Sequence, residues 1–128
     1  MKQLTKPKTL TLDIKKWRCG DNYGGNKSLG EGDTALGNEE GYQCCLGQFS
    51  LQLGARDITD KAEPYELGKI IPILTKDDDG TIVNTTFSKK AMLINDGDKT
   101  VKMKVKMLTT LCKKEGVELL IKNEHLIP

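Results

Sequence analysis

A run of glycines that ends in a compact apolar motif constrains the fold of this chain more than any other feature. Nine of the 13 glycines lie between Gly20 and Gly54, and the segment Gly41–Gly47 reads GYQCCLG. Glycine is favoured where φ must be positive or where the backbone approaches another group closely. The pattern therefore predicts a long, shaped loop over Gly20–Gly41, followed by a short apolar helix.

Length and charge indicate a single small domain and argue against a nucleic-acid-binding or membrane protein. The 128 residues suffice for one domain with a modest core, so we expect a single domain over 1–128 with flexible ends at 1–8 and 123–128. The 20 basic and 18 acidic side chains leave a net charge of only +2, whereas duplex-binding proteins usually carry a larger surplus. No apolar run approaches the roughly 18 residues of a membrane span, and the N-terminus lacks the apolar segment of a secretory signal. We therefore expect a cytoplasmic protein without a membrane or nucleic-acid partner.

Two segments with the two-residue period of a half-buried strand predict one small sheet. In Thr9–Ile14 the apolar side chains Leu10, Leu12 and Ile14 fall on one face. Val117–Ile121 is the second strand of that sheet. If both strands turn their apolar faces inward, the predicted helices have a surface to cover.

An edge strand and a turn are predicted in the middle of the chain. Ile70–Leu74 is interpreted as an edge strand, since Pro72 cannot donate to a ladder. Asp78–Gly80 suits a turn that leads into Thr81–Asn84. The acidic residues before Gly80 are expected to form a solvated turn, because they lack the alternating ligands and distal glutamate of a calcium loop.

The helix after the glycine-rich loop is expected to begin at Glu39 or Glu40, with Asn38 as its N-cap. Apolar side chains recur at helical spacing over Cys45–Leu53, and Gly54 suits the position that ends such a helix. Two internal glycines weaken its helix propensity by about 1 kcal/mol each.

Three more helical segments complete the predicted fold. Pro64–Gly68 is expected to form a short helical turn, and Ser88 to cap a helix that runs through Ile94. Thr100–Glu115 is the longest segment with helical periodicity. Its apolar stripe consists of Val101, Val105, Leu108 and Cys112. These elements predict a small α+β domain, in which a short sheet packs against two main helices beside the long glycine-rich loop.

The four cysteines are the first candidates for chemistry. They are Cys19, Cys44, Cys45 and Cys112. A reducing compartment favours free thiols. A helix N-terminus can activate a thiol, but the single histidine, His125, lies near the C-terminus, so packing is favoured over a reactive thiol. No Cys-x₂-Cys pair supports a zinc site. We therefore predict no catalytic residue, no metal site and no cofactor, and we expect serine at Cys44 or Cys45 to change stability and not a specific activity.

A small-ligand site in the glycine-rich loop is the alternative functional hypothesis. The loop contains neither a P-loop nor a dinucleotide fingerprint, and the neighbouring acidic residues would repel phosphate. Backbone N–H groups at the start of the following helix are nevertheless suited to an anion. The candidate ligand-binding residues, with two cations as counter-charges, are Arg18, Gly24, Gly25, Lys27 and Asn38.

A candidate partner surface lies on the longest predicted helix. Met103 and Met107 fall away from its apolar stripe, and methionine adapts well to binding surfaces. The predicted surface consists of Lys102, Met103, Lys106 and Met107. A second buried face is the alternative explanation of the methionines. Trp17 is assigned to the core, because a single aromatic side chain makes no platform for stacked bases.

Several short motifs carry a resemblance to a known family. The segments Trp17–Gly20, Asn38–Gly41 and Cys44–Gly47 read WRCG, NEEG and CCLG. In this respect the chain resembles a family of small uncharacterised bacteriophage and prophage proteins. It departs from their pattern at Cys112, where phenylalanine is more usual, and in its expanded Gly24–Gly32 segment. The resemblance implies a phage origin and a small α+β domain, and it carries no catalytic residue over to this chain.

These observations give two functional hypotheses. The first is a phage accessory protein that acts in the host cytosol as a non-catalytic binding module, with a host protein or an immune complex as its partner and immune evasion as its role. The alternative is a protein that binds and sequesters a small nucleotide-derived ligand.

Overall fold

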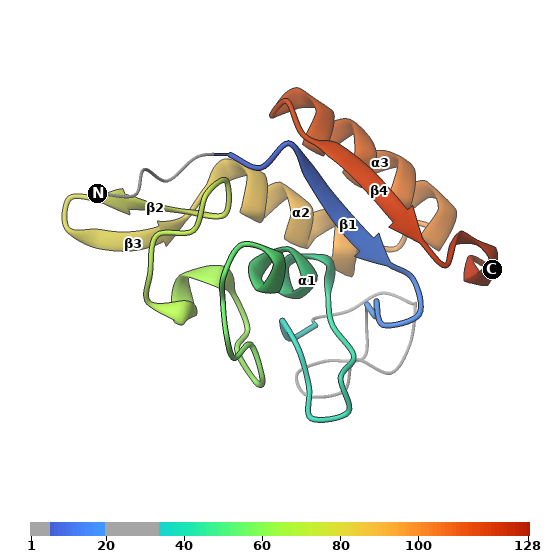
Figure 1. Ribbon diagram of the computed structural model, residues 1–128, viewed down its shortest axis with the longest axis horizontal. Coiled ribbons are helices and arrows are strands. Elements are labelled where there is room, and N and C mark those ends of the chain that lie inside the picture. Colours follow the sequence, from blue (N-terminus) through green and yellow to red (C-terminus); the bar gives the residue numbers. More distant parts are fainter. Residues whose placement is uncertain (1–5, 20–33) are drawn as a thin grey trace.

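Two short sheets and three α-helices form the described part of the fold, residues 6–19 and 34–128 of the computed structural model (Figure 1). This arrangement confirms the predicted α+β class. The strands are β1 Thr9–Asp13, β2 Thr75–Asp78, β3 Thr81–Asn84 and β4 Glu118–Lys122. The helices are α1 Cys45–Gln52, α2 Thr86–Asp96 and α3 Val101–Lys114, and two 3₁₀ turns cover Pro64–Leu67 and Glu124–Leu126.

The terminal strands pair as predicted, although they lie far apart in the sequence. β1 and β4 form a parallel pair in which Leu12 lies opposite Ile121. Leu10, Leu12 and Ile14 are fully buried, so the alternating pattern identified the inward face correctly. α1 contacts β1, α3 contacts β4, and α2 contacts both helices (Figure 1). The core therefore lies between one face of this sheet and the helices.

The first helix begins later than the sequence predicts. α1 starts at Cys45, and its N-cap is Cys44, whose Sγ accepts the Gly47 N–H at 3.4 Å. Asn38 is not a helix cap: its side-chain oxygen accepts the N–H groups of Glu40 and Tyr42, each at 3.0 Å. Such local bonds offer the backbone an alternative to the helix, which explains the later start.

The predicted edge strand over Ile70–Leu74 is also wrong. Ile73 has a φ of 69°, and the N–H groups of Leu74 and Thr75 both donate to the carbonyl of Ile71 at 3.0 Å. These bonds make turns, and the strand β2 begins only at Thr75. The hairpin from β2 to β3 does form, with its turn at Asp79 and Gly80, both at positive φ.

Threonine side chains cap the N-termini of the other two helices. Thr85, and not Ser88, caps α2 by accepting the Ser88 N–H at 3.2 Å. Thr100 caps α3, which ends before Gly116 at a φ of 75°, so the prediction for this helix is confirmed. No helix in residues 6–19 and 34–128 is long and apolar enough to cross a membrane.

Both ends of the described chain contact the domain. Lys6 pairs with Glu115 at 3.2 Å, and the Glu118 N–H donates to the Lys8 carbonyl at 3.0 Å. At the other end, Asn123 Nδ2 donates to the Asp13 carboxylate at 2.8 Å, just before the final 3₁₀ turn.

Candidate functional site

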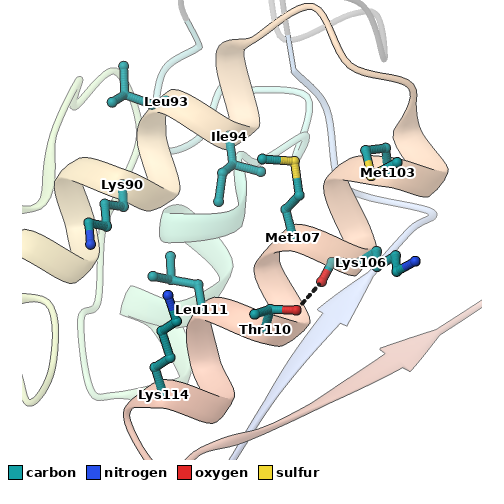
Figure 2. A pocket seen from close by; sticks show the side chains of 9 residues that line it. All are labelled: Lys90, Leu93, Ile94, Met103, Lys106, Met107, Thr110, Leu111 and Lys114. Atoms are coloured by element: carbon teal, nitrogen blue, oxygen red, sulfur yellow. Dashed lines mark hydrogen bonds between the residues drawn. The ribbon is translucent and has the colours of Figure 1, made fainter.

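A groove lies between α2 and α3 in the described surface. Its volume is about 480 Å³. Five apolar side chains, three lysines and one threonine line it: Lys90, Leu93, Ile94, Met103, Lys106, Met107, Thr110, Leu111 and Lys114 (Figure 2). We call this surface the α2/α3 groove.

The periodicity of α3 explains how the groove arises. The inward face of this helix buries Leu108 and Cys112, so Met103 and Met107 fall on the adjacent face, toward α2. Met103 remains 43% exposed, and on α2 Leu93 is 76% exposed. Leu93 and Met103 therefore form an apolar surface that no other described residue covers.

Three of the four residues predicted for a partner surface lie in this groove, namely Met103, Lys106 and Met107. Lys102 is exposed but does not line it. The sequence analysis missed the α2 side of the groove and Lys114 at the end of α3. A signal was present in α2, because Lys90, Leu93 and Ile94 recur at helical steps of three and four.

The charges at the groove all have one sign. Lys90 of α2 and Lys114 of α3 lie at one end, and Met103 lies at the other end (Figure 2). The Thr110 hydroxyl donates to the Lys106 carbonyl at 3.1 Å. Among the described residues, no acidic side chain lines the groove, so its apolar floor carries a purely basic rim.

A buried polar cluster fixes the two helices at the end of the groove where α2 leads into α3. Lys104 of α3 is 0% exposed, and its Nζ donates to the Asn95 carbonyl at 2.8 Å and to Cys19 Sγ at 3.4 Å. The Asn95 side-chain oxygen accepts Trp17 Nε1–H at 2.6 Å and the Cys45 N–H at 3.0 Å. Trp17 is fully buried, which confirms its assignment to the core. Bonds from one asparagine to three parts of the chain hold α2 against α1 and α3.

The sequence analysis also missed the burial of Lys104. Its position contained the signal, because Lys104 follows Val101 by three residues and precedes Leu108 by four, inside the apolar stripe. A lysine is rarely fully buried, so composition alone places it on the surface.

All four cysteines are buried. Burial raises the pKa of Cys44 to about 12 and that of Cys112 to about 11, against 9.0 for an exposed thiol. Burial also raises the pKa of Cys45 well above 9.0, and it raises that of Cys19, where the nearby Lys104 acts in the opposite direction. Because the thiolate is the reactive form, these thiols are suited to packing. Within the described residues, no group of three or more His, Cys, Asp or Glu side chains has the arrangement of a metal site.

The candidate small-ligand residues have structural contacts where the structure describes them. Arg18 Nη1 donates to the Trp17 carbonyl at 2.6 Å, and the guanidinium lies 4.3 Å from the centre of the Tyr42 ring. Asn38 holds the turn described above. Gly24, Gly25 and Lys27 lie outside the described residues.

Comparison with known proteins provides no relative for this chain. No family model matches it, and no curated protein or solved structure matches it significantly. Its function is therefore inferred from the geometry and charge of the α2/α3 groove.

Proposed function

We propose that this protein is a non-catalytic binding module of bacteriophage type, which holds a host protein through the α2/α3 groove. The observation that carries the proposal is the apolar floor of that groove, with Leu93 76% exposed and Met103 43% exposed beneath a rim of lysines. Exposed apolar surface of this kind, rimmed by polar groups, is typical of protein interaction sites. The phage origin and the host protein, with immune evasion as the outcome, are the part of the proposal that follows from the family resemblance.

The occupant that best suits the groove is an amphipathic α-helix with acidic flanks. A helix presents apolar anchors at steps of three and four, which can insert between two neighbouring helices such as α2 and α3. The flexible thioethers of Met103 and Met107 adapt to the shape of those anchors. Lys90, Lys106 and Lys114 then lie where acidic side chains on the flanks would meet them.

The absence of catalysis is part of the proposal. The buried thiols favour the protonated form, and no His, Asp, Glu or Cys side chain is among the described residues that line the α2/α3 groove. The surface is therefore suited to holding a partner and not to transforming it.

The proposal is tested with a synthetic helical peptide that carries leucines at steps of three and four and glutamates on both flanks. Its affinity is measured by fluorescence anisotropy for the parent protein and for Leu93→Glu and Met107→Glu. Each variant places a carboxylate in the apolar floor, so the dissociation constant should rise about tenfold or more. Leu126→Glu is the matched control, because Leu126 is similarly apolar and 45% exposed but lies outside the groove.

Two results would contradict the proposal. One is that Leu93→Glu and Leu126→Glu change the affinity for the acidic peptide by the same factor. The other is equal binding of a control peptide in which lysines replace the flanking glutamates. If a host protein is captured, it supports the proposal only when the parent protein and the Leu126→Glu variant both bind it and the Leu93→Glu variant does not.

A further inference from the structure

The sheet of β1 and β4 has two outer edges, and side chains close the edge at β1. Gln52 of α1 exchanges two hydrogen bonds with Thr11: the Thr11 N–H donates to Gln52 Oε1 and Gln52 Nε2 donates to the Thr11 carbonyl, both at 2.7 Å. Gln48 makes the same pair with Asp13, at 2.7 and 3.0 Å. These amides take the place of a neighbouring strand, so the β1 edge cannot accept another chain.

The edge at β4 is open. The Glu118 N–H donates to the Lys8 carbonyl, and the Lys122 carbonyl accepts the Ile14 N–H, both at 3.0 Å. Backbone groups alternate in direction along a strand, so those of Leu119 and Ile121 point away from β1. No other strand in the described residues pairs with β4, and exposed edges of this kind are templates for pairing with another chain.

There is room for a strand beside this edge. A hollow of about 460 Å³ lies against the first half of β4, and its lining includes Thr109 and Lys113 of α3 together with Val117 and Leu119. On the outer face of the sheet, Leu120 is 44% exposed. The hollow and an exposed apolar side chain therefore lie along the same edge.

The sequence of β4 is complementary to itself. In an antiparallel pair centred on Leu120, Leu120 faces the same residue of the second copy, Leu119 faces Ile121, and Glu118 faces Lys122. The pairs of Leu119 with Ile121 use the outward backbone groups, so each exchanges two N–H···O bonds. Opposite charges directly across a strand pair are favourable, and a two-fold axis produces this contact at both ends. A shift of two residues in either direction would separate the leucines and both charge pairs.

We infer that β4 pairs antiparallel with β4 of a second copy of this chain, centred on Leu120, to form a homodimer with one continuous four-stranded sheet. The interface is separate from the α2/α3 groove, and the inference does not rest on the proposed function. Its small size predicts a weak, concentration-dependent dimer.

The dimer is tested by sedimentation velocity from low micromolar to millimolar protein. Parent protein should pass from monomer to dimer with concentration. Leu120→Asp places two carboxylates opposite each other, so it should leave a folded monomer at every concentration, with folding checked by circular dichroism. Leu93→Asp, on the groove, is the matched control and should dimerise like the parent.

Charge reversal tests the register. Glu118→Lys and Lys122→Glu each place like charges opposite each other, so each should raise the dimer dissociation constant about tenfold. The double variant restores opposite charges and should return to the parent value. Three results would overturn the inference. The first is a parent protein that stays monomeric at millimolar concentration, and the second is a Leu120→Asp variant that still dimerises. The third is a double variant that dimerises as weakly as the single variants.

Discussion

α1 and α3 differ in how much of their surface the rest of the molecule covers. In α1, the consecutive residues Cys45–Ser50 are all buried, so the helix has almost no free face. In α3, an inward face containing Leu108 and Lys104 is buried, while Met103 and its neighbours remain exposed. The comparison teaches that the most distinctive motif in the sequence, CCLG, is part of the buried scaffold, whereas an ordinary amphipathic helix lines the groove that we propose for a partner.

The contacts around α1 explain this division. Gly47 approaches the backbone of Leu36 so closely that a Cβ there would overlap its carbonyl oxygen. Gln48 closes the edge of β1, and the Cys45 N–H binds Asn95 of α2. Each of these small or polar side chains fits one neighbour, so that only the last residues of α1, Leu51 and Gln52, are exposed.

The largest effect is expected at Gly47. Gly47→Ala should destabilise the protein by about 3 kcal/mol or more, because the backbone of Leu36 and not a flexible side chain opposes the new methyl group. Gly41→Ala is the control: Gly41 has a φ of 88° but open space around its Cα, so only backbone strain of about 1 kcal/mol is expected. Urea denaturation measures both free energies of unfolding, and equal losses would show that close packing of α1 is not the cause.

The two adjacent cysteines should respond differently to serine. Cys45 Sγ lies 3.9 Å from the Ala91 carbonyl, too far for a hydroxyl to bind, so Cys45→Ser should destabilise by about 1–3 kcal/mol. Cys44→Ser should stay within about 1 kcal/mol of the parent, because serine is a preferred N-cap and keeps the bond to Gly47. This separates two positions that the sequence alone treats as equivalent. A greater loss at Cys44 than at Cys45 in chemical denaturation would contradict the assigned roles.

Alkaline pH should destabilise the fold through its buried thiols. The folded state raises the pKa of Cys44 to about 12 and that of Cys112 to about 11, so it binds these protons more tightly than the unfolded chain, whose thiols titrate near 9.0. The stabilisation is complete below pH 9 and is lost as the pH rises toward the folded pKa values. At about pH 10 each such thiol accounts for about 1 kcal/mol of lost stability.

Cys112→Ala provides the control for that measurement. Between about pH 8 and about pH 10, its free energy of unfolding should fall by about 1 kcal/mol less than that of the parent. An identical fall in both proteins would mean that Cys112 does not contribute to the pH dependence.

The smallest effect on stability is expected on the exposed face of α3. Met103→Gln should change the free energy of unfolding by no more than about 0.5 kcal/mol, because the side chain is 43% exposed. The same variant should weaken binding of the acidic helical peptide in fluorescence anisotropy. A loss of stability comparable to that of Cys45→Ser would place Met103 in the core and support the alternative of a second buried face.

Much of the fold follows from local patterns in the sequence. The alternation in Thr9–Ile14 and the stripe of Val101, Leu108 and Cys112 predicted the right elements, because each repeats a period over several residues. The start of α1 could not be predicted this way, since Asn38 has the same side chain whether it caps a helix or holds a turn.

The sequence predicted the α3 side of the candidate site but not its α2 side. Met103 and Met107 stand out because they depart from the periodicity of their own helix. The contribution of Leu93 depends on where α2 packs against α3, and that is a tertiary contact. The sequence also did not show that the β1 edge of the sheet is closed while the β4 edge is open. That difference arises because Gln48 and Gln52 of α1 bind the backbone of β1, which is another tertiary contact.

The most direct test of the contrast between the two helices is site-specific photo-crosslinking. A photoreactive phenylalanine analogue is placed at Leu93, in the α2/α3 groove, or at Leu51, an exposed position on α1, and each protein is irradiated with the acidic helical peptide. If the groove is the binding surface, the peptide should crosslink from Leu93 and not from Leu51, and excess unlabelled peptide should abolish the product. Equal crosslinking from both positions, or crosslinking from Leu51 alone, would contradict the claim that α1 is scaffold and the α2/α3 groove is the site.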